Sequence, residues 1–134
     1  MLEDGQVIGP DENVLRRVPV SQVKLGALIP ITRGAFTPTP SDTDGLSFYL
    51  EREVDIAQLK EIARKPADQY VVVRLSVRDL NDAGLQVIAK KADNLPGHCL
   101  VPDFNYQSYS DKTEKTEKWI PVQEALRRKA EIVG

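Results

Sequence analysis

Apolar and polar positions alternate along parts of the first half of the chain, and this pattern predicts β-strands. The segment Leu46–Leu50 alternates with a period of two, so its leucines and Phe48 share one face of a strand. Residues 14–20 carry a shorter strand pattern, in which Pro19 ends regular pairing or marks a sheet edge. Tyr70–Ser76 is β-branched and almost continuously apolar, which is typical of a central strand buried on both faces.

Helical spacing of apolar residues occurs in three other parts of the chain. Asp55 is placed to cap a helix over residues 55–65, where apolar side chains recur at helical intervals until a proline stops the run. Ser76 is placed to cap a short helical turn over residues 77–83. The segment after Pro121 predicts a C-terminal helix that ends in a basic cluster, and the polar run before it predicts a solvated helix or loop.

Short strands are also predicted at residues 27–31, 85–89 and 99–101. The mixture of elements predicts an α+β fold, with a small mixed or mostly antiparallel sheet flanked by two or three helices. A length of 134 residues fits one domain. We expect residues 1–13 to be a flexible lead-in, because they are acidic and rich in turn residues, and residues 14–134 to form the domain with its C-terminal helical extension.

A long loop follows the first strands. Residues 32–45 are dense in Gly, Pro, Ser, Thr and Asp and lack the period of either regular element. Loops of this length inside a compact domain are uncommon, and they tend to be functional or disordered. We expect Phe36 to dock this loop onto the core.

The charge balance gives no general attraction to nucleic acid or to anionic lipid. The chain has 18 Lys and Arg against 20 Asp and Glu, a formal net charge of -2. No apolar run approaches the ~20 residues of a membrane span, and the N-terminus lacks the features of a signal peptide. We therefore expect a cytoplasmic protein with no nucleic-acid and no membrane partner.

The residue composition and the missing motifs also limit which metal sites, cofactors and enzyme classes are expected. Cys99 is the only cysteine, so the chain has no thiolate cluster to hold zinc or an iron–sulfur centre. A glycine-rich phosphate loop, a His-Glu zinc motif and a Gly-x-Ser-x-Gly elbow are all missing from the sequence. We expect no cofactor and no metal, and the common enzyme classes that these motifs mark are excluded.

The candidate catalytic residues are His98, Ser47 and Asp44. His98 is the only histidine, and its ordinary pKa makes it the one ready general base. Asp44 and Ser47 place a carboxylate and a hydroxyl where the long loop enters a strand, although Asp44 also fits an ordinary turn. Cys99 follows His98 and should face the opposite side of a strand as a small buried residue, so the two cannot act as a pair.

The candidate ligand-binding residues are Arg16, Arg17 and Asp93. The two arginines are adjacent in a predicted strand, so one must point to the less polar side or into a cleft. An inward arginine requires an anion, which is either an internal carboxylate such as Asp44 or Asp93 or a group of a bound ligand. Asp93 lies in an Asp-Asn-Leu-Pro-Gly segment that also fits a tight turn.

The order of these segments resembles a family of small uncharacterised bacterial proteins. Its members combine an arginine-bearing strand, a loop with a phenylalanine, a Leu-Ser strand entered after an aspartate, a Leu-Gly-Leu-like turn and an Asp-x-x-Pro-x-His segment. The matching segments span about residues 14–119 and are residues 15–18, 35–36, 44–47, 83–85 and 93–98. The charged stretch before Trp119 and the extension after it depart from the family. The resemblance implies a grouping and no activity.

A second, looser similarity is to ADP-ribosyltransferases, which hold NAD with an arginine, a serine-bearing strand and a later glutamate. Arg16 or Arg17, Ser47, and Glu51 or Glu53 would take these roles. Both glutamates follow the serine much sooner than in that family.

Two hypotheses from different classes follow. The first is a protein-binding accessory module without enzymatic activity, antitoxin-like or encoded beside its partner, that binds another protein or self-associates. It predicts an exposed aromatic patch, for which Tyr106, Tyr109 and Trp119 are the candidates. The second is a nucleotide or small-molecule binding domain, with or without activity, in which one cleft is lined by Arg16 or Arg17, Asp44, Ser47, Asp93 and His98.

Overall fold

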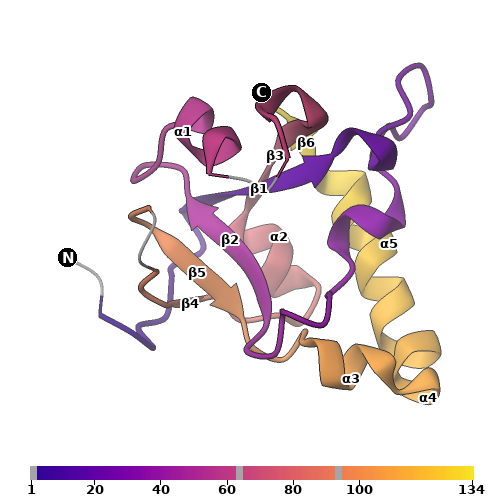
Figure 1. The fold of residues 1–134 in the computed structure, drawn as a ribbon. Coiled ribbons are helices and arrows are strands. Elements are labelled where there is room, and N and C mark those ends of the chain that lie inside the picture. Colours follow the sequence, from indigo (N-terminus) through magenta and orange to yellow (C-terminus); the bar gives the residue numbers. More distant parts are fainter. Residues whose placement is uncertain (1–2, 63–64, 93–94) are drawn as a thin grey trace.

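The computed structural model describes residues 3–62, 65–92 and 95–134, and within them six strands form one sheet (Figure 1). The order across the sheet is β4-β5-β2-β1-β3-β6, and every pairing is antiparallel. The strands are β1 (Asn13–Pro19), β2 (Leu46–Leu50), β3 (Tyr70–Ser76), β4 (Ile88–Ala89), β5 (His98–Val101) and β6 (Glu131–Ile132). The predicted α+β class and mostly antiparallel sheet are confirmed.

The three strands with the clearest sequence patterns occur where the patterns predict them. β1 pairs with β3 over its whole length, and Pro19 is its last residue. In β3, Val72 and Val73 point to opposite faces, and both are buried, as expected of a central strand. In β2, Leu46 and its two period-two neighbours belong to the larger core, while Tyr49 packs into a smaller one on the other face.

Two predicted strands are shorter or different in the structure. Residues 27–30 form a loop, because Gly26 turns the chain at a φ of 88° and the amide of Lys24 binds the carbonyl oxygen of Pro30 at 2.7 Å. Of the predicted strand 27–31 only Ile31 is extended, in an isolated β-bridge with Val23. The predicted strand 85–89 keeps only its last two residues, since the Leu85 amide instead bonds back to the carbonyl of Leu80 at 2.9 Å.

The two predicted helix caps are confirmed. The carboxylate of Asp55 accepts a hydrogen bond of 2.9 Å from the Ala57 amide at the start of α1 (Ile56–Glu61). The hydroxyl of Ser76 accepts one of 3.0 Å from the Asp79 amide at the start of α2 (Val77–Asp82). Helix α1 is shorter than the predicted helix 55–65, and residues 63–64 lie outside the described residues.

The remaining helical elements lie in the connections and toward the C-terminus. Short 3-10 turns occupy η1 (Val20–Gln22), η2 (Arg33–Phe36) and η3 (Ala67–Gln69). After β5 come α3 (Tyr106–Ser110), α4 (Lys112–Glu114), the π-helical η4 (Lys115–Trp119) and α5 (Ile120–Lys129). The polar run 112–118 is therefore helical, and the predicted C-terminal helix with its basic last turn is confirmed. No helix in the described ranges is long and apolar enough to cross a membrane.

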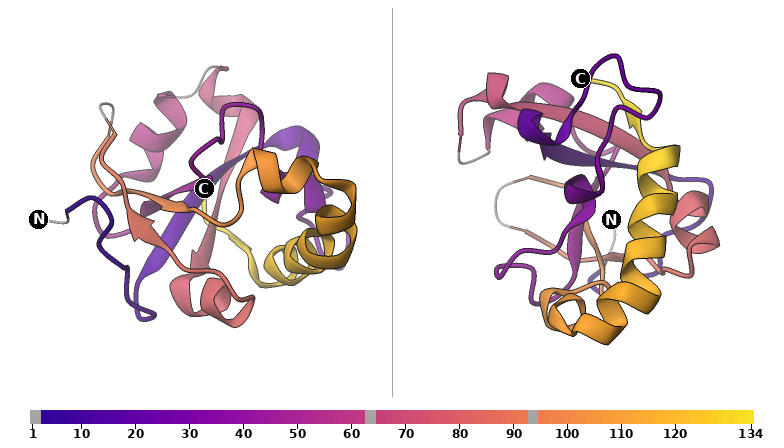
Figure 2. Two further views of the ribbon diagram at one scale, coloured as in Figure 1. Left: turned by 90° about the horizontal axis from the view of Figure 1, so that it is seen from below. Right: turned by 90° about the vertical axis from the view of Figure 1, so that its right-hand side faces the viewer.

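Helices cover the two faces of the sheet unequally. Helices α2 and α5 lie on one side, and α1 lies on the other over one end of the sheet (Figure 2). The larger core fills the first side and includes Phe36, so the long loop is docked as expected. The smaller core consists of Leu15, Tyr49 and Val72 of the sheet together with Leu59 of α1. Nearer β5, the second face carries the polar Ser47 and His98 beside the apolar Leu100.

Both ends of the described chain join the sheet. Val7 forms a β-bridge with Ile88, the Gly5 amide binds the carbonyl of Ala89 at 2.8 Å, and Ile8 is buried. The expectation that residues 1–13 form a flexible lead-in differs from this arrangement, because Val7 and Ile8 complete the edge beside β4. At the other end β6, which the sequence did not predict, pairs with β3.

Candidate functional site

Ser47 and His98 lie on neighbouring strands and face the same side of the sheet. In the antiparallel pairing of β2 with β5, Tyr49 is opposite His98 and Ser47 is opposite Leu100. Residues opposite each other share a face, and so do residues two apart in a strand. The Nε2 atom of His98 lies 3.2 Å from Oγ of Ser47. The sequence-predicted convergence of these two residues is present in the structure.

The other nitrogen of His98 decides which way this hydrogen bond runs. Nδ1 lies 2.7 Å from the carbonyl oxygen of Lys90, and a carbonyl can only accept, so Nδ1 carries a proton. In a neutral ring Nε2 is then an acceptor, and the Ser47 hydroxyl donates to it. Burial, together with the charges of Arg17 and Lys90, lowers the pKa of His98 from its ordinary value of 6.5, against the raising effect of its bond to the Lys90 carbonyl. The ring is therefore neutral at pH 7.

Arg17 brings positive charge to the same face. Leu15 is opposite Tyr49, and Arg17, two residues further along β1, points to the side that carries Ser47 and His98. Its Nη1 atom donates a hydrogen bond of 3.0 Å to the carbonyl of Leu59 at the end of α1. A guanidinium has five N–H donors in a planar fork, so the group can bind an anion and α1 together.

Arg16 points to the opposite side and has a different role. Its Nε donates to the carbonyl of Ala35 at 2.9 Å and its Nη1 to the carbonyl of Ser47 at 2.9 Å, and it lies 5.8 Å from the ring centroid of Phe48. Burial lowers the pKa of Arg16 to about 10, against the nearby charge of Asp42. Asp44, one of the anions offered for an inward arginine, is not its partner, because backbone carbonyls accept from this guanidinium instead.

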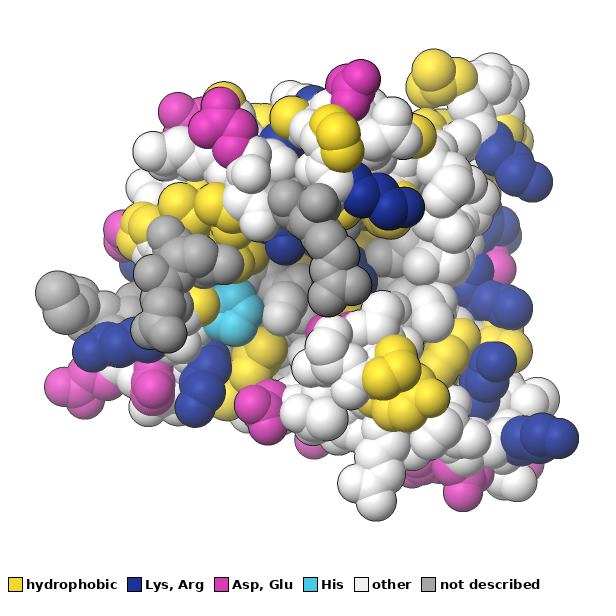
Figure 3. Space-filling model, viewed as in Figure 1, with side chains coloured by type: hydrophobic (Ala, Val, Ile, Leu, Met, Phe, Trp, Pro, Cys, Tyr) yellow, Lys and Arg dark blue, Asp and Glu magenta, His cyan; other side chains and the backbone are white. Residues whose placement is uncertain are grey.

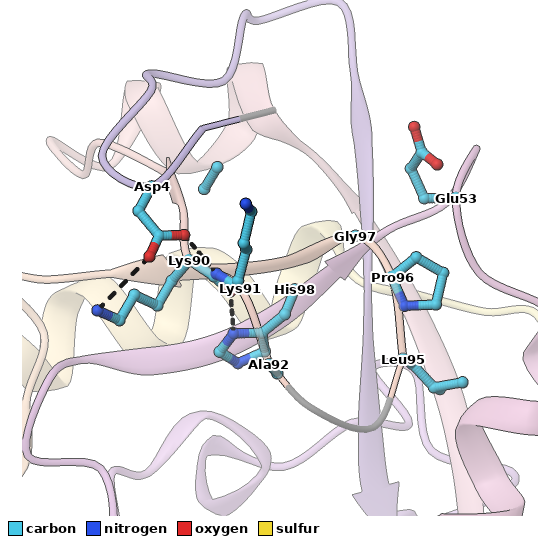
Figure 4. A pocket seen from close by; sticks show the side chains of 10 residues that line it. Asp4, Glu53, Lys90, Lys91, Ala92, Leu95, Pro96, Gly97 and His98 are labelled. Atoms are coloured by element: carbon cyan, nitrogen blue, oxygen red, sulfur yellow. Dashed lines mark hydrogen bonds and ion pairs between the residues drawn. The ribbon is translucent and has the colours of Figure 1, made fainter. Parts of the chain in front are cut away.

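A cavity of about 560 Å³ opens on the other side of His98 (Figure 4). It lies in the hairpin between β4 and β5, with lysines at one wall and a Leu-Pro-Gly segment at the other. Lys90 lies 4.0 Å from the carboxylate of Asp4, which also accepts a hydrogen bond of 2.7 Å from the Lys91 amide. Its described lining residues are Asp4, Glu53, Ala89, Lys90, Lys91, Ala92, Leu95, Pro96, Gly97 and His98. Figure 3 shows the histidine at the surface with basic side chains close by.

Asp44, the third predicted catalytic residue, does not join this site. Asp44 is exposed and makes no hydrogen bond or ion pair with the residues that the structure describes. Asp93 lies outside the described residues. Cys99 is buried on the opposite face, and this burial raises the pKa of its thiol to about 12. The prediction that Cys99 cannot pair with His98 is confirmed.

The predicted aromatic interface is largely wrong. Trp119 is fully buried and stacks on Phe104, with ring centroids 4.5 Å apart. Tyr109 is buried as well, and its hydroxyl donates a hydrogen bond of 3.3 Å to Gln123. Only Tyr106 of the three candidates is exposed. The aromatic side chains that sequence reasoning assigned to a surface form the contact between the α3–α4 segment and α5.

The structure also adds residues that the sequence reasoning did not select. Lys90 supplies both the carbonyl that orients His98 and a charge beside it. The sequence did contain a signal for this contact. Predicted strands at 85–89 and 99–101, joined by a turn, form a hairpin, and a hairpin puts Lys90 beside His98. Leu59 takes part in the site only through its backbone carbonyl, which accepts a hydrogen bond from Arg17. Its side chain therefore gave no indication of this contact.

The glutamates required by the ADP-ribosyltransferase resemblance have other partners. Glu51 forms an ion pair with Arg74 at 3.1 Å, and Glu53 forms one with Arg52 at 2.7 Å.

Comparison with protein-family models, curated proteins and solved structures finds no match to the chain. No group of His, Cys, Asp and Glu residues in the described ranges could hold a metal ion.

Proposed function

We propose that the protein binds a small acidic molecule on the sheet face formed by Ser47, His98 and Arg17. The hydrogen bond between His98 and Ser47, with the Lys90 carbonyl fixing the ring, is the observation that carries this proposal. Both side chains are only partly buried. A ligand can therefore reach polar groups that the fold has already oriented.

The charges on this face favour an acidic ligand. Arg17 and Lys90 both act on His98 as positive charges. No ion pair neutralises Arg17 within the described residues, and Lys90 has only a loose contact with Asp4 at 4.0 Å. A carboxylate or phosphate group would be attracted by these cations and could accept from the Arg17 guanidinium.

The segments that carry the family resemblance support the same location. Arg16 in β1 binds the carbonyls of Ala35 in the long loop and of Ser47 in β2. His98 in β5 then contacts the side chain of Ser47. Four parts of the sequence that resemble the family thus meet around β2, although they are far apart along the chain.

A ligand panel tests this function. Purified protein is heated with nucleotides, NAD, sugar phosphates and dicarboxylates, and the same panel is run on Arg17→Gln and on the control Arg33→Gln. Arg33 is exposed, so it reports general charge effects. A ligand at about 100 times its Kd adds about 2.7 kcal/mol and raises the melting temperature by several degrees. We expect a shift that Arg17→Gln loses and Arg33→Gln keeps. A flat panel contradicts the proposal.

A second candidate function, protein binding, is favoured by a different observation. Leu25 is 84% exposed and Leu28 is 100% exposed, in a loop that the Ala27 amide closes by binding the Lys24 carbonyl at 3.1 Å. We define residues 24–30 as the apolar loop. Exposed apolar side chains on a hydrogen-bonded turn suit an apolar pocket of another protein or a second copy of this one.

Sedimentation velocity over a range of concentrations tests self-association through the apolar loop. We expect the wild type to associate and the variant Leu25→Ser/Leu28→Ser to remain monomeric. A binding partner, if one is retained from a native extract, should be lost with the same variant. A wild type that stays monomeric and retains the same proteins as the variant contradicts this function.

A further inference from the structure

We propose that Ser47 is a nucleophile activated by His98, and that the site transfers an acyl group from a small ester bearing a carboxylate or phosphate. This inference rests on the proposed binding function and adds a reaction to it. A nucleophilic serine requires a base within hydrogen-bond reach and a third group that orients the base. The contacts of Ser47, His98 and Lys90 meet these requirements.

The geometry supplies base and orienter in the required protonation states. The carbonyl of Lys90, 2.7 Å from Nδ1, holds the ring with its acceptor nitrogen toward Ser47. The Ser47 hydroxyl lies 3.2 Å from that nitrogen and donates a hydrogen bond to it. In serine hydrolases a carboxylate usually orients the histidine. Here a backbone carbonyl occupies that position, so the histidine gains orientation without a negative charge.

The hydroxyls of Ser76, Ser108 and Ser110 have contacts of a structural kind. Ser76 accepts a hydrogen bond from the Asp79 amide as a helix cap. Ser108 donates to the carbonyl of Asp103 at 3.3 Å, and Ser110 donates to the carbonyl of Gln107 at 2.8 Å. These partners cannot take a proton, whereas the neutral imidazole beside Ser47 can. Ser47 therefore differs from them in chemistry as well as in position.

The reaction balances with water as the only other reactant. Oγ of Ser47 attacks the ester carbonyl carbon while its proton moves to Nε2 of His98. The bond from that carbon to the alcohol oxygen breaks, and Nε2 returns the proton to the departing alkoxide. Water then attacks the acyl-serine, again giving its proton to Nε2, and the acid is released as the proton returns to Oγ. Arg17, one of the two cations that act on His98, would stabilise the negative charge formed at the carbonyl oxygen.

A fluorophosphonate probe tests the nucleophile without knowledge of the natural substrate. Reaction forms the bond from Oγ to phosphorus and breaks the P–F bond, with the proton passing to His98 and fluoride leaving. Intact-mass and peptide spectrometry at pH 8 follow the adduct in the wild type, Ser47→Ala, His98→Gln and Ser108→Ala. Ser108 is the matched control, because its hydroxyl is also partly buried and bonded, but to a backbone carbonyl.

We expect one adduct, on Ser47, that disappears in Ser47→Ala and is unchanged in Ser108→Ala. His98→Gln should slow the labelling at least about 100-fold, the usual contribution of a general base. Melting curves of each variant show whether it is folded. If His98→Gln unfolds, the comparison is made in the wild type by lowering the pH through the titration of His98, which should slow the labelling of Ser47. An adduct on another residue, or equal rates with and without His98, overturns the proposal.

The two proposals fail in different ways. If the ligand panel gives shifts that depend on Arg17 but Ser47 is not labelled, the site binds acidic molecules and the nucleophile is wrong. If Ser47 is labelled with dependence on His98 but the panel is flat, the reactive pair stands and the acidic ligand is wrong. A panel ligand that also slows the labelling supports both proposals at one site.

Discussion

The side-chain amide of Gln123 donates a hydrogen bond of 2.8 Å to the carbonyl oxygen of Phe36, which joins helix α5 to the long loop 32–45. The same nitrogen lies 3.1 Å from Oγ1 of Thr37, and the amide oxygen accepts from the Tyr109 hydroxyl at 3.3 Å. Gln123 is fully buried. The long loop thus has its backbone held, at the last residue of η2, by a side chain 87 residues away in sequence.

Gln123→Leu should destabilise the protein by about 2–4 kcal/mol, because leucine leaves a buried carbonyl and a buried tyrosine hydroxyl without partners. Urea unfolding followed by circular dichroism measures the change. Gln107→Leu is the control, since Gln107 is exposed, and it should change the unfolding free energy by less than about 0.5 kcal/mol. Equal midpoints for the two variants would show that the contact to Phe36 contributes nothing.

Arg16→Met should cost about 3 kcal/mol, because the change removes two charge-assisted hydrogen bonds and leaves the carbonyls of Ala35 and Ser47 unpaired. Methionine keeps most of the apolar stem, so the loss reports the guanidinium. Arg33→Met serves as the comparison at an exposed position and should be nearly neutral. Urea unfolding of both variants measures the difference, and a neutral Arg16→Met would contradict the role given to this residue.

Gly45→Ala should be strongly destabilising at the entrance to β2. Gly45 has a φ of 130°, and an added Cβ would clash with the carbonyl oxygen of Val101. Gly84 is a matched control with a φ of 84° and nothing within 4 Å of an added Cβ. Gly84→Ala should cost about 1–2 kcal/mol from backbone strain alone. We expect a clearly lower melting temperature for Gly45→Ala than for Gly84→Ala, and equal values would contradict the clash.

The Cys99 thiol should react with Ellman's reagent at pH 8 only as fast as the native protein opens. Burial raises its pKa to about 12, so little thiolate forms, and the reagent cannot reach the core. The control is Cys99→Ala/Ser110→Cys, which moves the thiol to an exposed position and should react at the rate of a free thiol. Fast reaction of wild-type Cys99 without denaturant would contradict its burial.

The fold was predictable from sequence where local pattern and tertiary structure agree. Alternation in Leu46–Leu50 and the helix-capping residues Asp55 and Ser76 led to correct elements, because the preferences of neighbouring residues decide them. The two residues of β6 carry no such pattern, since their pairing with β3 depends on where α5 delivers the chain. Short strands fixed by distant parts of the chain are not visible in a local window.

The site could be predicted only in part, because residue chemistry is visible in the sequence and the pairing of distant strands is not. Residue chemistry identified His98 and Ser47, and the structure places them in contact. Sequence could not decide which arginine faces them, because that depends on the register between β1 and β2. It also placed Trp119 at a surface, since an aromatic residue after a charged run fits an interface and a core equally well. Contacts through backbone atoms, such as the Leu59 carbonyl that accepts from Arg17, have no side-chain signature.

The stability of the protein should fall as the pH is lowered through the ordinary histidine pKa of 6.5, and His98 should account for part of that fall. Burial lowers the pKa of His98 in the folded state, so between the folded and unfolded values the unfolded chain binds more protons. This contribution is fully present above 6.5 and is lost as the pH drops toward the folded value. His98→Gln lacks it, so the difference between wild-type and variant unfolding free energies should shrink as the pH is lowered from 8 to 5. The labelling rate of Ser47 should fall over the folded-state titration, because a protonated Nε2 cannot accept the hydroxyl proton. Parallel stability curves for the two proteins would contradict the neutral, buried state of the ring on which the proposed reaction depends.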